Sequence, residues 1–167
     1  MKTQRRQLVL LMLFVSALIP AFAQIAGDQA INSQTGGIDS ALLAKANAGD
    51  APSQVLVGES YAAGNGQARN SKQLADDLKQ AAEWYRKAAE QGDVTAQGIL
   101  GTLYSMGQGV PLSYPDAYYW LDLAAHVKGP NQEKYAANRQ SIGTRITADE
   151  LADVQDRVDK WLATHPR

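Results

Sequence analysis

The sequence predicts an all-α protein, a short α-solenoid in which helical hairpins stack in a row. The main observation is an internal repeat, because residues 49–66 recur at 92–109 with a constant offset of 43 residues. Self-similarity at a period of about 20–50 residues is typical of stacked repeat arrays. No segment alternates apolar and polar residues with the period of a strand, so no sheet is expected. The identical positions are Gly49/Gly92, Asp50/Asp93, Gln54/Gln97, Gly58/Gly101, Tyr61/Tyr104, Gly64/Gly107 and Gly66/Gly109.

Turn and capping residues divide the chain into seven expected helices. A glycine after a helix favours the left-handed conformation that ends it, and Asp, Ser or Thr favours the position before the next helix. Thr147 and Glu150 have the spacing of a capping box. The helix stops are Gly49 and Gly92, and the other caps are Asp50, Asp93 and Ser113. The expected helices span residues 40–48, 51–63, 71–91, 94–106, 114–127, 131–141 and 148–164.

Each repeat is expected to hold a first helix, helix A, followed by a second, helix B. A matched block aligned on Trp84 and Trp120 marks helix B in both repeats. Repeat 1 has 17 residues between its last turn glycine and the tryptophan, whereas repeat 2 has 10. Seven extra residues keep helical phase to within about 20°. We therefore favour a helix B in repeat 1 that starts near Ser71 and is longer by about 10 Å. A longer loop over residues 67–73 is the alternative.

Helix A of repeat 2 presents one apolar stripe, made of Ala96, Leu100 and Tyr104 at spacings of four residues. Gly101 lies beside this stripe, where the missing side chain lets the neighbouring helix approach closely. Gly98 lies away from the stripe, so Gly98→Ala is expected to stabilise the helix by up to about 1 kcal/mol. The equivalent residues of repeat 1 are Ser53, Val57, Tyr61 and Gly58.

The N-terminus has the pattern of a secretory signal peptide over residues 1–23. Three basic residues precede a 12-residue apolar run, and a small-x-small cleavage site ends at Ala23. The run is shorter than the roughly 20 residues that span a bilayer, so no membrane span is expected in the mature chain. We therefore expect export, and we favour the periplasm of a bacterium over secretion.

Past the signal peptide, the chain is expected to hold one folded domain. Residues 24–38 are polar and without apolar period, and we interpret them as a flexible leader. Residues 39–167 are expected to form a single helical-repeat domain. Its parts are repeat 1 at about 49–91, repeat 2 at about 92–128 and a C-terminal cap at 129–167.

Composition excludes several classes of function. Without the three basic residues of the signal peptide, the net charge falls from −1 to −4. Since there is neither a basic excess nor a basic run, binding to nucleic acid or to anionic membranes is not expected. The chain has no Cys, which excludes disulfides, thiolate chemistry and Cys-based metal sites.

Both repeats carry a recurring set of Ala, Gly, Tyr and Trp positions. In repeat 2 these are Ala96, Gln97, Leu100, Gly101, Tyr104, Gly107, Gln108, Gly109, Val110, Asp116, Ala117, Trp120, Ala124 and Ala125. In repeat 1 they are Gly49, Asp50, Gly58, Tyr61, Gly64, Gly66, Trp84, Lys87, Ala88, Ala89 and Gly92.

At these positions the chain resembles the Sel-one-like repeat family, helical relatives of the tetratricopeptide repeats. The resemblance covers about residues 41–128. Repeat 1 departs from the family pattern at Ser53 and Val57, where the family favours Ala and Leu, and it carries the seven-residue insert. The resemblance implies a right-handed solenoid that acts as an interaction scaffold or adaptor. Exported members of the family are common in Gram-negative bacteria.

No catalytic or metal-binding constellation stands out. His126 and His165 are isolated, and no His, Asp or Glu cluster has the spacing of metal ligands. Gly64-Asn-Gly66 and Gly107-Gln-Gly109 could cradle a phosphate. Each is a repeat-equivalent turn with no strand before it, so we interpret both as interhelix turns. We therefore expect no catalytic residue, no cofactor and no metal, in a protein that is not an enzyme.

Aromatic residues are expected to serve packing first. Trp84 and Trp120 are repeat-equivalent and are expected in the core, and Trp161 is expected to pack the last helix onto repeat 2. Tyr114, Tyr118 and Tyr119 cluster at the start of the second helix B. At least one of them is expected to face outward, either as half-buried packing or as a binding anchor.

The candidate binding surface is the inner face of the solenoid, opposite the apolar stripe of each helix A. The residues assigned to it are Gln54, Val55, Glu59, Gln97, Thr102 and Ser105. We expect an exported, non-enzymatic adaptor that binds an unidentified protein or peptide there, as a monomer or with weak self-association. One alternative is an envelope subunit that self-associates through the extended helix B. Another is a cell-wall-related small-ligand binder or hydrolase.

Overall fold

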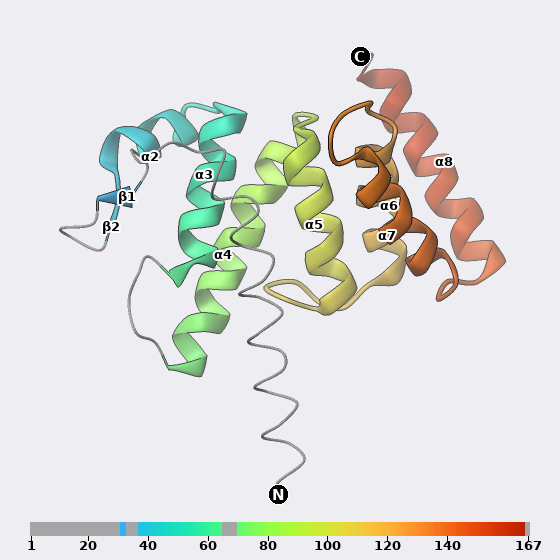
Figure 1. The fold of residues 1–167 in the computed structure, drawn as a ribbon, viewed down its shortest axis with the longest axis horizontal. Coiled ribbons are helices and arrows are strands. Elements are labelled where there is room, and N and C mark those ends of the chain that lie inside the picture. The colour runs from blue at the N-terminus through green and yellow to red at the C-terminus, as the bar shows by residue number, and fades with distance from the viewer. Residues whose placement is uncertain (1–30, 33–36, 65–69, 166–167) are drawn as a thin grey trace, which may run out of the picture.

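The protein is a row of helices packed side by side along the long axis of the molecule (Figure 1). The structure is a computed structural model and describes residues 31–32, 37–64 and 70–165. This described part contains seven helices, and each packs on the next from α2 to α7, while α8 packs on α6. The predicted all-α repeat architecture is therefore confirmed. The helices are α2 (Ser40–Asn47), α3 (Ala51–Ala62), α4 (Ser71–Glu90), α5 (Val94–Met106), α6 (Tyr114–Ala125), α7 (Gln132–Gly143) and α8 (Ala148–Thr164).

A short antiparallel pair precedes the helices. β1 (Ile31–Asn32) pairs with β2 (Gly37–Ile38), and Ile31 lies opposite Ile38. Ile38 packs against the cluster that contains Trp84. This pair was not expected from the sequence, because two-residue strands are too short to produce an alternating pattern. The flexible leader at residues 24–38 stays a prediction. The expected signal peptide, residues 1–23, lies outside the described residues.

Side-chain caps begin the helices at the positions that the sequence predicts. Each predicted cap accepts a hydrogen bond from the backbone N–H three residues further on, and these caps are Asp50, Asp93, Ser113 and Thr147. Glu150 completes the predicted capping box with Thr147. Gly49 and Gly92 have φ angles of +98° and +89°, in the left-handed region that glycine adopts without steric cost.

The predicted long helix B of repeat 1 is confirmed. α4 has 20 residues and α6 has 12, so α4 is longer by about 12 Å. Asn70 caps α4, and its side chain and that of Gln73 form a reciprocal capping box. Of the loop considered over residues 67–73, the helix takes residues 71–73, while residues 67–69 lie outside the described part.

Helix A and helix B of each repeat touch at a glycine, as predicted. A Cβ atom added at Gly101 would lie 2.7 Å from Cγ of Leu121 and 3.0 Å from the backbone oxygen of Ala117. A Cβ atom at Gly58 would lie 2.8 Å from Cε1 of Tyr85. Contacts this short require a neighbour to move, so these two glycines set the distance between the paired helices.

The expectation that Gly98 lies away from packed surfaces was wrong. Gly98 is buried, and a Cβ atom added to it would overlap the ring of Tyr135, which is itself buried in α7. The repeat pattern ends before α7, so the sequence gives no sign that this helix covers the side of α5 that carries Gly98.

The three tryptophans lie where the sequence predicts. Trp84 and Trp120 are buried in the core. Trp161 is partly buried and packs against that core, with its ring 3.4 Å from the place a Cβ atom would take at Gly92. Because α8 also packs on α6, Trp161 holds the last helix against repeat 2 and its junction with repeat 1.

A buried ion pair joins α7 to α6. The Asp122 side chain is 8% exposed, and its Oδ1 accepts a hydrogen bond from Nη1 of Arg139, whose side chain is 34% exposed. His126 Nδ1 lies 3.7 Å from the same oxygen. A buried carboxylate without a cation is strongly destabilising, so the position of α7 depends on Arg139.

We predict that Gly98→Ala and Gly101→Val both destabilise the fold. Overpacking typically costs roughly 1–3 kcal/mol, and for Gly98→Ala up to about 1 kcal/mol of improved helix propensity offsets part of this cost. Urea denaturation followed by circular dichroism measures the change. Gly129→Ala is the control, because a Cβ atom there meets nothing within 4 Å. A Gly98→Ala variant more stable than the parent would contradict the packing of Tyr135 on α5.

We predict that Arg139→Met lowers the free energy of unfolding by roughly 2–4 kcal/mol, since it leaves Asp122 buried without its main counter-charge. The double variant Asp122→Leu/Arg139→Met is expected to recover most of this loss, because an apolar pair carries no desolvation penalty. Denaturant midpoints of the two variants give the comparison. A double variant no more stable than Arg139→Met would show that the ion pair is not the source of the effect.

Candidate functional site

Two of the predicted inner-face residues are glutamines that join consecutive helices. Gln54 Nε2 donates to the carbonyl of Ala46 at 3.0 Å, and Gln97 Nε2 donates to the carbonyl of Ala89 at 3.1 Å. These carbonyls lie in the last turns of α2 and α4, past the point where the helix supplies its regular N–H donors. Each also accepts a turn hydrogen bond, from the N–H of Gly49 at 3.1 Å and from that of Gly92 at 3.0 Å, so the glutamine amide is a second donor. Gln54 is 4% exposed and Gln97 is 0% exposed. Their assignment to a partner-binding face is therefore corrected, and their role is structural.

Val55 is also buried, in the core cluster that spans both repeats. Its assignment to the inner face is corrected for the same reason. The assignment of these residues to the inner face rested on their angle around an isolated helix. In the array, each helix A is covered on two sides, by the helix before it and by the helix after it. The part of each helix A that stays accessible is therefore narrower than the exposed side of an isolated helix. We call this part the accessible strip, and it contains Glu59, Thr102 and Ser105.

Glu59, Thr102 and Ser105 keep part of their side chains accessible. The hydroxyl of Thr102 donates to the carbonyl of Gly98 at 2.9 Å, and that of Ser105 donates to the carbonyl of Thr102 at 2.7 Å. Both donors are thus used within α5. A partner could reach the remaining lone pairs of these hydroxyls and the carboxylate of Glu59.

Glu59 is the accessible charged residue on this strip, and its surroundings disfavour the ionised form of its carboxyl. The side chain is partly buried, and this burial raises the pKa of the carboxyl above its ordinary value of 4.5. No cation pairs with it in the described part of the chain. Burial and the nearby Glu59 carboxylate together raise the pKa of the Tyr85 hydroxyl. The carboxylate therefore lacks a counter-charge that a bound cation would supply.

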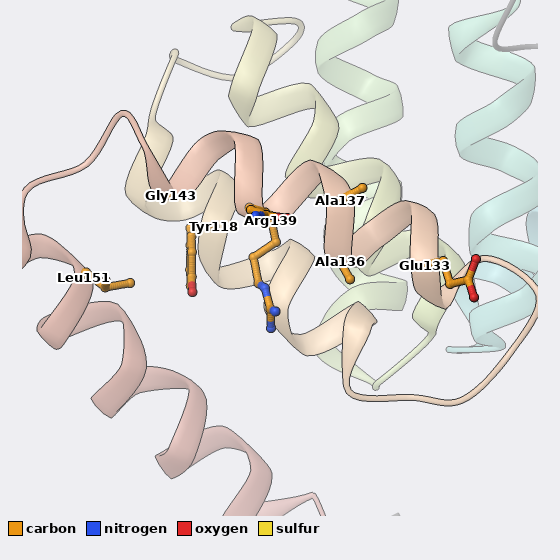
Figure 2. A pocket seen from close by; sticks show the side chains of 8 residues that line it. Tyr118, Glu133, Ala136, Ala137, Arg139, Gly143 and Leu151 are labelled. Carbon is orange, nitrogen blue, oxygen red and sulfur yellow. The ribbon is translucent and has the colours of Figure 1, made fainter.

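A second accessible feature is a groove of about 540 Å³ at the C-terminal end, between α6, α7 and α8 (Figure 2). Tyr118 and Leu151 form two of its walls, and small residues of α7 form its floor. The lining residues are Tyr118, Glu133, Ala136, Ala137, Arg139, Gln140, Gly143 and Leu151. An outward tyrosine was predicted among the three at the start of α6, but the groove was not predicted. The sequence feature that could have indicated the groove is the pair of adjacent small residues Ala136 and Ala137.

The described residues hold no group of three or more side chains that could bind a metal ion. His126 Nδ1 lies 2.8 Å from the carbonyl of Asp122, and the ring of His165 stacks on Trp161 at 4.1 Å between centroids. Gly107 and Gly109 have φ angles of +66° and +70° and form the turn between α5 and α6. Within the described ranges, no helix combines the length and apolar character that crossing a membrane requires.

Comparison with known families agrees with this geometry. Residues 51–93, which contain α3 and α4, and residues 94–126, which contain α5 and α6, each match the Sel1 repeat. The chain carries two Sel1 repeats. The predicted resemblance is confirmed, and Sel1 repeats generally mediate protein–protein interactions and are typically non-enzymatic. None of the curated proteins matches the sequence.

A solved structure also resembles the array. It is the crystal structure of a protective antigen present in uropathogenic Escherichia coli strains, displaying an SLR fold. The likeness has a TM-score of 0.61 at 28% sequence identity and covers 73% of this chain. The matched region is 24% of the antigen, so this chain corresponds to about a quarter of that protein's length.

We predict that Glu59→Gln stabilises the protein in a pH-dependent way. Because the folded pKa of Glu59 is raised above 4.5, the native state keeps its proton to higher pH than the unfolded chain does. The protonated Glu59 carboxyl therefore contributes fully to stability below the pKa of Glu59 in the unfolded chain. This contribution is lost as the pH rises through the pKa of Glu59 in the folded protein. The gain from Glu59→Gln should be absent near pH 4 and positive at neutral pH, as urea midpoints would show. An equal gain at both pH values, or a gain in the exposed control Glu83→Gln, would contradict this cause.

Proposed function

We propose that this protein is an exported, non-enzymatic adaptor that binds a protein or peptide on the accessible strip of its helix-A face. The observation that carries the proposal is Glu59, a partly buried carboxylate with no counter-charge among the described residues. The two Sel1 repeats support a protein as the partner. Export, to the periplasm or beyond the cell, rests on the signal-peptide pattern of residues 1–23.

The partner is a segment that presents a Lys or Arg side chain to Glu59. A cation placed beside a partly desolvated carboxylate gains more than one beside a fully hydrated carboxylate, because the local dielectric constant is lower. Thr102 and Ser105 would accept hydrogen bonds from the partner's backbone or side chains. With two repeats the strip is small, so the affinity depends on this charge pair and is modest.

The test begins with a partner isolated by crosslinking in the exported compartment. We predict that Glu59→Arg lowers its affinity by about tenfold or more, because a charge reversal replaces attraction with repulsion. Glu59→Gln should give a smaller loss, and Thr102→Arg should also weaken capture by blocking the strip. Affinity is measured by titration calorimetry, on variants whose melting temperatures confirm that they fold.

Glu83→Arg is the matched control, since it makes the same charge reversal at an exposed position of α4. Its affinity for the partner should equal that of the parent chain. If Glu59→Arg and Thr102→Arg bind normally while folded, the strip is not the binding surface and the proposal fails.

A further inference from the structure

α7 joins the array as a third helix A, although it lies beyond the two matched Sel1 repeats, which end at residue 126. Gln132 Nε2 donates to the carbonyl of Ala125 at 3.1 Å, in the last turn of α6. At the start of α5, Gln97 makes the same contact with Ala89 in the last turn of α4. The glutamine at each junction therefore fixes which residues of α7 correspond to those of α5.

A second contact at each junction confirms this correspondence. Between α4 and α5, Nη2 of Arg86 donates to the hydroxyl of Tyr104. Between α6 and α7, Nη1 of Arg139 donates to the buried carboxylate of Asp122. Tyr104 and Arg139 both lie seven residues after the glutamine of their helix. The two contacts therefore occupy equivalent places, although their chemistry differs.

In this register the accessible strip has equivalents on α7. The fifth residue after the glutamine is Glu59 in α3, Thr102 in α5 and Ala137 in α7. The eighth residue is Ser105 in α5 and Gln140 in α7. Ala137 and Gln140 are exposed, and both line the groove beside α7. The strip therefore continues from α5 into the groove, on a third helix that the family match does not include.

The side chain at the fifth position changes from charged to apolar along the row of helices. It is a carboxylate at Glu59, a hydroxyl at Thr102 and a methyl group at Ala137. The carboxylate of Glu59 is partly buried, so a cation gains most at the α3 end of the strip. The methyl group of Ala137 offers no hydrogen bond, so the α7 end suits a group without charge.

The rest of the groove agrees with an uncharged apolar group at the α7 end. The ring of Tyr118 and the side chain of Leu151 add hydrocarbon surface to it (Figure 2). The charge of Arg139 is balanced by Asp122. Glu133, one helical turn before Ala137, adds a negative charge to the lining. An acidic side chain is therefore disfavoured in the groove.

We propose that the partner of the accessible strip is an extended segment that crosses α3, α5 and α7, with a Lys or Arg side chain at Glu59 and an uncharged apolar side chain at Ala137. The inference rests on the proposed function, which supplies the Glu59 end. Each step between successive helices A is about one helix diameter, roughly 10 Å. Two steps take roughly 20 Å, which is about six residues of extended chain. An even separation places the basic and the apolar side chain on the same side of such a segment.

The test starts from a photoreactive amino acid placed at Ser105, in the middle of the strip, in the exported protein. The segment that it captures is made as a synthetic peptide and titrated calorimetrically into the full mature chain. Ala137→Arg should weaken binding by about fivefold or more, because the long charged side chain fills the apolar end of the site. The control Ala163→Arg makes the same change at an exposed position of α8 and should bind as the parent chain does. Melting temperatures equal to that of the parent show that both variants fold.

Nuclear magnetic resonance locates the two ends of the peptide. The backbone amides of Glu59, Thr102 and Ala137 should shift during the titration with one common midpoint. A peptide cut to about four residues at its basic end spans only one step. It should therefore keep the shift at Glu59 and lose the shift at Ala137.

The outcomes separate this inference from the proposed function. If Glu59→Arg weakens binding while Ala137→Arg binds with the parent affinity, the partner stops short of α7 and only this inference is overturned. A shift at Ala137 that persists with the short peptide overturns it as well. If both variants bind normally, or if no segment is captured at Ser105, both proposals fail.

Discussion

The array depends on how the end of one helix is joined to the start of the next. The last carbonyls of a helix have no N–H donor inside it, and buried carbonyls must be paired with a donor. In this chain a glutamine amide of the following helix donates to such a carbonyl at Ala46, Ala89 and Ala125. At Ala46 and Ala89 it joins a turn hydrogen bond from the backbone N–H of Gly49 and Gly92. The glutamine donors are Gln54, Gln97 and Gln132. Because the same hydrogen bond occurs at three successive junctions, each hairpin is placed on the previous one in a similar way.

Close approach within each hairpin is the second constraint. Gly58 and Gly101 let helix A and helix B come together until backbone and side chain touch. Outside the matched repeats a different interaction takes over, since α7 is held on α6 by Arg139 and the buried Asp122. The row of helices therefore ends with an ion pair and with a tyrosine that packs on Gly98. The repeats, by contrast, are held together by apolar packing.

These constraints leave two accessible surfaces with different chemistry. The strip around Glu59 has a carboxylate whose desolvation is uncompensated, which suits a cationic group of another molecule. The groove beside α7 has small side chains, the ring of Tyr118 and a balanced ion pair. The two surfaces therefore differ in what they offer another molecule, an unpaired charge at Glu59 and a hollow of small side chains beside α7.

The sequence alone determined the features that depend on local chemistry and on the internal repeat. Asp93 and Gly92 had to lie between two helices, because their capping and left-handed preferences act within a few residues. The insert before Trp84 favoured a longer α4 over a longer loop, because seven residues preserve helical phase. The close approach at Gly101 followed from its place beside an apolar stripe.

Only the tertiary structure decided which surfaces stay open. Gln54, Val55 and Gln97 lie on the side of helix A that a single helix would expose, yet neighbouring helices bury all three. Gly98 was covered by Tyr135 from a helix beyond the repeats, and the groove arose because α8 packs on α6 and not along α7. Burial of this kind is set by contacts between segments distant in sequence, whereas helical periodicity reports only the angle of a residue around its own axis.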